Sequence, residues 1–269
     1  MIKMKKFKII DSHCHIYPDK IAEKASNATA DFYDLPPSMD GKISTLLEHG
    51  IAAGIDHFIV QSVATTPKQV SSINNFIASA VAESEGKFTG LGTLHPDSED
   101  MKADVDEIIR LGLRGVKLHP DIQKVQLDDP RMLKMYELCE GKLPILIHTG
   151  DNRYDYSNPN RMIPILEAYP NLTVIGAHFG GWSIWEDAWR DYAGRENFYV
   201  DCSSSLYAIT PEKAKELIEI YGVKRVLFGT DYPLWTPESE IERFMKLDLS
   251  DSEREDILYN NAAAMFGIK

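Results

Sequence analysis

The segment FKIIDSHCHI, residues 7–16, starts as an apolar strand and ends in polar residues. This pattern decides the fold because it recurs along the chain. Apolar runs without alternation are typical of strands that are buried on both faces of a parallel sheet. We expect eight strands, at 7–16, 55–63, 88–96, 114–120, 144–150, 172–181, 198–205 and 225–233.

Helix-type segments separate these strands, and several carry start signals. A capping side chain stands before a proline at Asp129-Pro130, Thr210-Pro211 and Thr236-Pro237. Ser250 and Glu253 have the spacing of a capping box. Strand and helix alternating in this way predict an α/β chain forming a (β/α)8 TIM barrel, as a single domain over 1–269. An open doubly wound sheet is the alternative.

The composition limits the partners. The chain of 269 residues has a net charge of −12, which disfavours nucleic acid and anionic membranes. It still allows a small anionic substrate, because a local basic group can dominate a pocket. The three cysteines are widely spaced, which disfavours disulfides, and with no apolar run long enough for a membrane span we expect a cytoplasmic protein. The sequence leaves the oligomeric state open, a homo-oligomer included.

The longest expected loop, about 17–38, follows the first strand and contains Phe32, Tyr33 and Pro36-Pro37. A loop of this length is usually functional or disordered. Because this loop begins just after His13 and His15, we interpret it as a lid over the active site.

The histidines are not scattered along the chain. Six of the eight, together with Asp231, fall at the carboxyl ends of expected strands: His13, His15, His95, His119, His148 and His178. In a barrel those ends meet on one face, where active sites are built. Closure of the barrel would bring Asp231 beside His13 and His15, with His148 across the mouth. Three imidazoles and a carboxylate suit one divalent metal ion, zinc first and manganese second.

Five motifs in this order, DSHCHIYP, GVKLHP, ILIHTG, GAHFGG and FGTDYP, closely resemble the amidohydrolase superfamily. The resemblance is strongest to its amidohydrolase-related branch, which also holds metal-dependent decarboxylases. It implies that His13, His15, His148 and Asp231 hold the metal. It also implies that His178 orients the attacking water or the substrate, and that Asp231 carries the proton.

Lys117 and His119 share a strand face at the fourth strand end, and we assign both to substrate binding. In binuclear members of the superfamily a lysine at this strand is carboxylated and bridges two metals, so a second metal would require a carboxylated Lys117. We favour a plain ammonium. For His95 a structural role is the better interpretation, and for Arg153 an exposed position, although Arg153 could hold a substrate carboxylate.

The resulting hypothesis is a metal-dependent hydrolase in which activated water attacks an amide, ester or lactone carbonyl of a small molecule. The alternative is a metal-dependent decarboxylase or hydratase that uses the same ligands on a carboxylated substrate. A phosphoesterase is disfavoured because no acidic residue ends the third or fourth strand. An inactive binding barrel is disfavoured because none of the five motif residues is missing.

Overall fold

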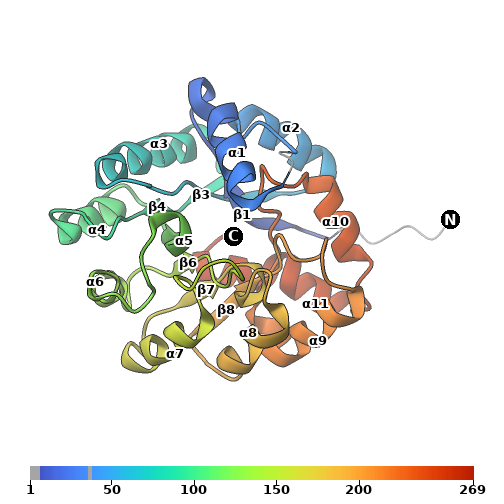
Figure 1. Ribbon diagram of the computed structural model, residues 1–269. Helices are drawn as coiled ribbons and strands as arrows, with labels where there is room; N and C mark the ends of the chain where they lie inside the picture. The colour runs from blue at the N-terminus through green and yellow to red at the C-terminus, as the bar shows by residue number, and fades with distance from the viewer. Residues whose placement is uncertain (1–6, 36–37) are drawn as a thin grey trace.

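The computed structural model describes residues 7–35 and 38–269. Helices form a ring around the central strands (Figure 1). The strands are β1 (Ile10–His15), β2 (His57–Gln61), β3 (Phe88–Gly90), β4 (Gly92–Thr93), β5 (Val116–Leu118), β6 (Ile145–Ile147), β7 (Val174–Gly176), β8 (Phe198–Asp201) and β9 (Val226–Leu227). All of the paired strands run parallel.

The helices follow the strands in alternation. They are α1 (Asp19–Tyr33), α2 (Ile43–Ala53), α3 (Val70–Glu83), α4 (Met101–Arg110), α5 (Pro120–Gln123), α6 (Pro130–Cys139), α7 (Pro159–Ala168), α8 (Trp185–Tyr192), α9 (Pro211–Tyr221), α10 (Pro237–Met245), α11 (Asp251–Glu255) and α12 (Asn261–Phe266). Short 3-10 turns lie at Pro67–Gln69, His178–Gly180 and Val223–Arg225, and a π-helical turn at Asp256–Asn260 joins α11 to α12.

Hydrogen bonds carry the strand pairing around the whole barrel. β3 and β4 occupy one strand position that is interrupted at Leu91, whose N–H still donates to the Val60 carbonyl. The first strand meets the last at two points: Ser12 N–H donates to the Phe228 carbonyl at 2.9 Å, and His15 N–H to the Tyr232 carbonyl at 2.7 Å. The barrel prediction is confirmed, and the open-sheet alternative is wrong, because its first and last strands would not pair.

Apolar side chains fill the barrel interior below the polar strand ends. They are Ile10, Ile59, Leu91, Leu146, Ile175 and Leu227, and Ala262 and Phe266 of α12 pack against them. A second, larger core lies between the strands and the ring of helices. The strands are therefore apolar on both faces, which explains the runs without alternation.

The helix start signals act as the sequence predicts. The side chains of Asp129, Thr210 and Thr236 accept hydrogen bonds from backbone N–H groups in the first turns of α6, α9 and α10. Ser250 and Glu253 form the reciprocal capping box of α11. In the described part of the chain, no helix combines the length and apolar character that a bilayer crossing needs.

The expected structureless loop at 17–38 is wrong, because most of it is the helix α1. Its buried face consists of Ala22, Ser26, Ala30 and Tyr33. Three of these side chains are small, so the helical period carries almost no hydrophobic signal in the sequence. Pro36 and Pro37 lie outside the described residues. The lid role stays a prediction.

Asp11 ties the first strand to the last. Its carboxylate is fully buried and accepts hydrogen bonds from Thr230 N–H at 2.9 Å, Thr230 Oγ1–H at 2.6 Å and His13 N–H at 3.1 Å. Burial raises its pKa to about 6, against the lowering effect of these bonds.

We predict that Asp11→Ala lowers the free energy of unfolding by about 2–4 kcal/mol, because it leaves buried N–H donors without an acceptor. Urea denaturation measures the change. Glu219→Ala, at an exposed position of α9, is the control and should stay within about 0.5 kcal/mol of the parent. An Asp11→Ala protein as stable as this control would show that the hydrogen bonds of Asp11 contribute nothing to stability.

Candidate active site

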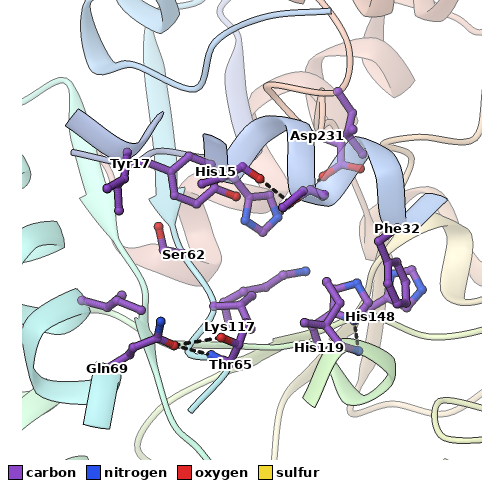
Figure 2. Close-up of a pocket in the computed structure, with 18 of the residues that line it drawn as sticks. His15, Tyr17, Phe32, Ser62, Thr65, Gln69, Lys117, His119, His148 and Asp231 are labelled. Carbon is purple, nitrogen blue, oxygen red and sulfur yellow. Dashed lines mark hydrogen bonds and ion pairs between the residues drawn. The ribbon is translucent and has the colours of Figure 1, made fainter. Parts of the chain in front are cut away.

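Seven of the residues that the sequence nominates line one cavity of about 540 Å³ at the carboxyl ends of the strands. They are His13, His15, Lys117, His119, His148, His178 and Asp231. Figure 2 shows His15 and Asp231 on one side, and Lys117, His119 and His148 on the other. The strand-end pattern in the sequence therefore locates the cavity.

Three donor atoms converge at one point of this cavity. His13 Nε2 lies 3.2 Å from His15 Nε2 and 3.3 Å from Asp231 Oδ1, and His15 Nε2 lies 3.7 Å from Asp231 Oδ1. Ligands bound to zinc at about 2.0–2.2 Å in a tetrahedron lie about 3.3–3.6 Å apart. The three side chains therefore fit a divalent cation.

The two imidazoles carry the protonation state that a metal needs. Burial lowers the pKa of both His13 and His15 well below 6.5, and the nearby Lys117 ammonium adds to the effect. Both rings are therefore neutral at pH 7, which leaves lone pairs for coordination.

Asp201 fixes the orientation of His13, and the sequence analysis missed it. His13 Nδ1 lies 2.9 Å from Asp201 Oδ2, and both side chains are fully buried. A proton on Nδ1 leaves Nε2 as the acceptor. The other oxygen of Asp201 accepts from the backbone N–H groups of His178 and Ser203. Its place at the end of β8 was the signal that could have found it.

Asp231 is held in a left-handed backbone conformation, with φ of 60°. Its Oδ2 accepts a hydrogen bond from Ser204 Oγ at 2.5 Å, and the Trp235 indole N–H donates to the same Ser204 oxygen. Burial raises the pKa of Asp231 to about 7, whereas Ser204 and Lys117 act in the opposite direction. In the metal-free protein this carboxyl therefore holds its proton more tightly than an exposed aspartate does.

Lys117 is 1% exposed and points at the same cluster. Its Nζ lies 3.2 Å from His13 Nε2. Burial lowers its pKa to about 8, although the carboxylates of Asp231 and Asp201 favour the charged form. The site thus contains a buried lysine that still carries a positive charge at pH 7.

His178 stacks on His13 with ring centroids 5.2 Å apart. Its Nδ1 lies 3.0 Å from the Ser203 carbonyl, so Nδ1 carries the proton and Nε2 is free to accept. Burial lowers the pKa of His178 to about 3. The ring is neutral, so it can accept a hydrogen bond but cannot act as an acid at pH 7.

His148 lies apart from the three converging donor atoms. Its Nε2 lies 3.0 Å from the Gly150 carbonyl, and its ring stacks on His119 with centroids 4.2 Å apart. The Tyr33 hydroxyl contacts His119 Nε2 and lies 3.3 Å from His148 Nδ1. Tyr33, which we expected in a lid loop, therefore reaches the site from the last turn of helix α1.

The other nominated residues lie outside the centre. His95 accepts from Asp97 N–H, in agreement with the structural role that we preferred. Arg153 is exposed, as expected. Its guanidinium also pairs with Asp151 and lies over the rings of Phe32 and Tyr33.

Two further groups of side chains in the described residues have donor atoms close enough for a cation: His13, His178 and Asp201, and Asp121, His148 and Asp151. In the first, Asp201 and the Ser203 carbonyl already accept from the Nδ1 atoms of the two histidines. In the second, Arg153 neutralises Asp151. The His13, His15 and Asp231 group is the one that faces the open cavity.

The family model described as Amidohydrolase matches residues 10–268. The chain belongs to the amidohydrolase family. It is an enzyme of that superfamily, and the resemblance seen in the five sequence motifs is confirmed. The match covers every strand of the barrel and the final helices.

The individual relatives share about a quarter or less of their residues with this chain. A curated relative, 2-amino-3-carboxymuconate-6-semialdehyde decarboxylase of Dictyostelium discoideum, is 26% identical over 246 residues, covering 73% of this chain and 66% of that protein, just under two thirds of its length. Among solved structures, 5-carboxyvanillate decarboxylase from Sphingomonas paucimobilis has a TM-score of 0.80 at 19% identity, covering 98% of this chain and 100% of that chain.

A second structural neighbour contains a metal. Dihydroxybenzoic acid decarboxylase from Polaromonas sp., solved with bound manganese and the inhibitor 2-nitroresorcinol, has a TM-score of 0.70 at 18% identity and covers 97% of each chain. At these identities the structural likeness establishes the shared barrel.

We predict that the buried charge of Lys117 costs stability in the metal-free protein. Its folded pKa of about 8 lies below its usual 10.5, so the unfolded chain binds more protons between these values and stability rises with pH across that window. At pH 7 the free energy of unfolding of Lys117→Met should be about 3 kcal/mol higher than that of the parent protein. The difference between the two proteins should disappear by about pH 10.5.

Urea denaturation with a chelator present, at pH 7 to 10.5, measures this gap. Lys134→Met, at an exposed position of α6, is the matched control for losing a lysine. A gap that does not change with pH would contradict the assignment.

Proposed function

We propose that this enzyme is a metal-dependent decarboxylase that releases CO2 from a small carboxylated substrate. The observation that carries the proposal is the placement of a buried lysine, Lys117, and a buried carboxyl, Asp231, in one cavity. The first can bind a substrate carboxylate, and the second can hold the proton that must replace the lost CO2.

In this proposal His13, His15 and Asp231 hold one divalent cation, zinc or manganese, and His148 remains the predicted fourth ligand. A cation bound there would act as a Lewis acid on substrate oxygen atoms. The fit of the three donor atoms and the manganese in the Polaromonas neighbour support the assignment. A single ion leaves Lys117 uncarboxylated.

Lys117 would anchor the substrate. A carboxylate that enters the cavity leaves water, and the buried ammonium compensates part of that cost. His119 lies on the same side of the cavity and would contact the substrate beside it. Lys117 also fixes which end of the substrate faces Asp231.

Asp231 would supply the proton. When the bond between the substrate carbon and its carboxylate breaks, the electron pair stays on that carbon, and CO2 leaves. The carbon then takes a proton delivered through Asp231, and solvent replaces that proton. His178 is neutral and accepts through Nε2, so it would orient a substrate hydroxyl rather than donate the proton.

The comparisons support decarboxylation more than the hydrolysis that the sequence analysis placed first. The curated relative and both neighbours described above carry decarboxylase names. Hydrolysis stays as the second candidate because the free Nε2 of His178 could equally orient a water molecule. The three buried free cysteines support the cytoplasmic location, which stays a proposal, as does a homo-oligomer.

We predict that His13→Ala loses both metal and activity. Metal content by elemental mass spectrometry and CO2 release from 2,6-dihydroxybenzoate and 5-carboxyvanillate are the measurements. Activity should fall by more than about 100-fold, because residues behind the ligands alone change affinity by about 10–100-fold. His49→Ala, which removes a histidine on the exposed side of α2, should retain both. Lactone hydrolysis without CO2 release would favour the second candidate.

Asp201→Asn tests the role of the residue behind His13. The amide can donate toward His13 Nδ1 and so favours the wrong tautomer. We expect the affinity for manganese to fall by about 10–100-fold, measured by titration of the metal-free protein. An unchanged affinity would show that Asp201 serves the fold alone.

A further inference from the structure

The cavity extends beyond the polar strand ends into a slot between α1 and α3. Its apolar lining there is Ile21, Ala25 and Ala28 of α1, and Ile73 and Phe76 of α3, beside the polar Lys20 and Ser72. We call the part of the cavity that these five apolar residues line the outer arm. The chemistry proposed above takes place at the strand ends and uses none of them.

α1 has two separate apolar faces. One face, Ala22, Ser26, Ala30 and Tyr33, is buried. The other consists of Ile21, Ala25, Ala28 and Phe32, whose spacing of four, three and four residues places them on one side of a helix. All four line the cavity. Ile21, at one end of this face, is 45% exposed, whereas Phe32, at the other end, contacts Arg153.

The size of the side chains leaves the arm open. Ala25 and Ala28 stand in the middle of the α1 face, opposite Ile73 and Phe76, which are one turn apart on α3 and half-buried. Small residues on one wall and large ones on the other make room for an inserted apolar group. A single ring that carries a carboxylate would fill only part of a 540 Å³ cavity.

Arg153 contacts the Phe32 end of the α1 face that lines the cavity. The Arg153 guanidinium lies 5.0 Å from the Phe32 ring and donates to the Phe32 carbonyl at 2.5 Å, and Asp151 pairs with the same guanidinium. These contacts fix the end of α1 nearest His148.

We infer that the outer arm binds an apolar substituent of the substrate, so that the substrate class is an aromatic carboxylate with an alkyl chain or second ring on the side away from its carboxylate. This inference rests on the proposed function, in which Lys117 holds the carboxylate. The arm opens directly into the cavity that contains Lys117, and this continuity favours a small molecule over a second protein.

The first experiment measures binding to the manganese-loaded enzyme by calorimetry, with benzoate and its 4-ethyl, 4-butyl and 4-hexyl derivatives as probes. Affinity should increase about two- to fourfold per methylene group, as expected when each leaves water. These probes are used for binding alone, so the result does not depend on turnover.

Ala28→Trp should fill the arm and remove the dependence on chain length. Asn27→Trp is the matched control, because it places the same bulk one residue away, on an exposed position that does not line the cavity, and it should keep the parent dependence. Phe76→Ala, which removes the opposite wall, should reduce the gain per methylene group. Melting temperatures identify any variant that fails to fold.

A parent enzyme without chain-length dependence overturns the inference, and so does equal dependence in the parent and Ala28→Trp. CO2 release from 2,6-dihydroxybenzoate and its 4-butyl derivative is measured in parallel. If the probes show the dependence but neither acid loses CO2, the decarboxylase proposal fails and the outer arm stands.

Discussion

The pairing of β1 with the segment after β9 is the contact on which the rest of the site depends. Ser12 and His15 donate backbone hydrogen bonds to Phe228 and Tyr232, and Asp11 reinforces the pairing through Thr230. These bonds join residues that are more than 200 positions apart. They bring His13 and His15 to Asp231, and without them the three donor atoms would not converge.

Desolvation then determines the chemistry of the converged groups. The protein carries a net charge of −12, yet the cavity holds neutral imidazoles, one cationic lysine and a carboxyl of raised pKa. Burial is the largest cause of the pKa shifts of Lys117, Asp231 and His178 alike. Burial disfavours the charged form of each of these groups. The charges that remain therefore depend on neighbouring charged groups and on a bound ligand. The overall charge of the chain therefore says little about the ligand.

α1 links the catalytic centre to the outer part of the cavity. Tyr33, at its last turn, contacts His119 and lies near His148. The other face of the helix lines the outer arm. Arg153 donates to the Phe32 carbonyl near the end of this helix, so one helix contacts both His119 and the outer arm. A helix with small residues on both faces suits this role, since it packs closely on one side and leaves space on the other.

The sequence by itself determined the barrel, the helix starts and the set of polar strand ends. These are local signals: runs such as FKII need burial on both faces, and Asp129 or Thr210 caps a helix within three residues. Only the tertiary structure decided that 17–38 is largely helical, that Asp201 orients His13 and that His148 lies apart from the other donors. The reason is physical. Each of those outcomes depends on contacts between residues far apart in the chain, or on alanine faces whose burial produces no hydrophobic period.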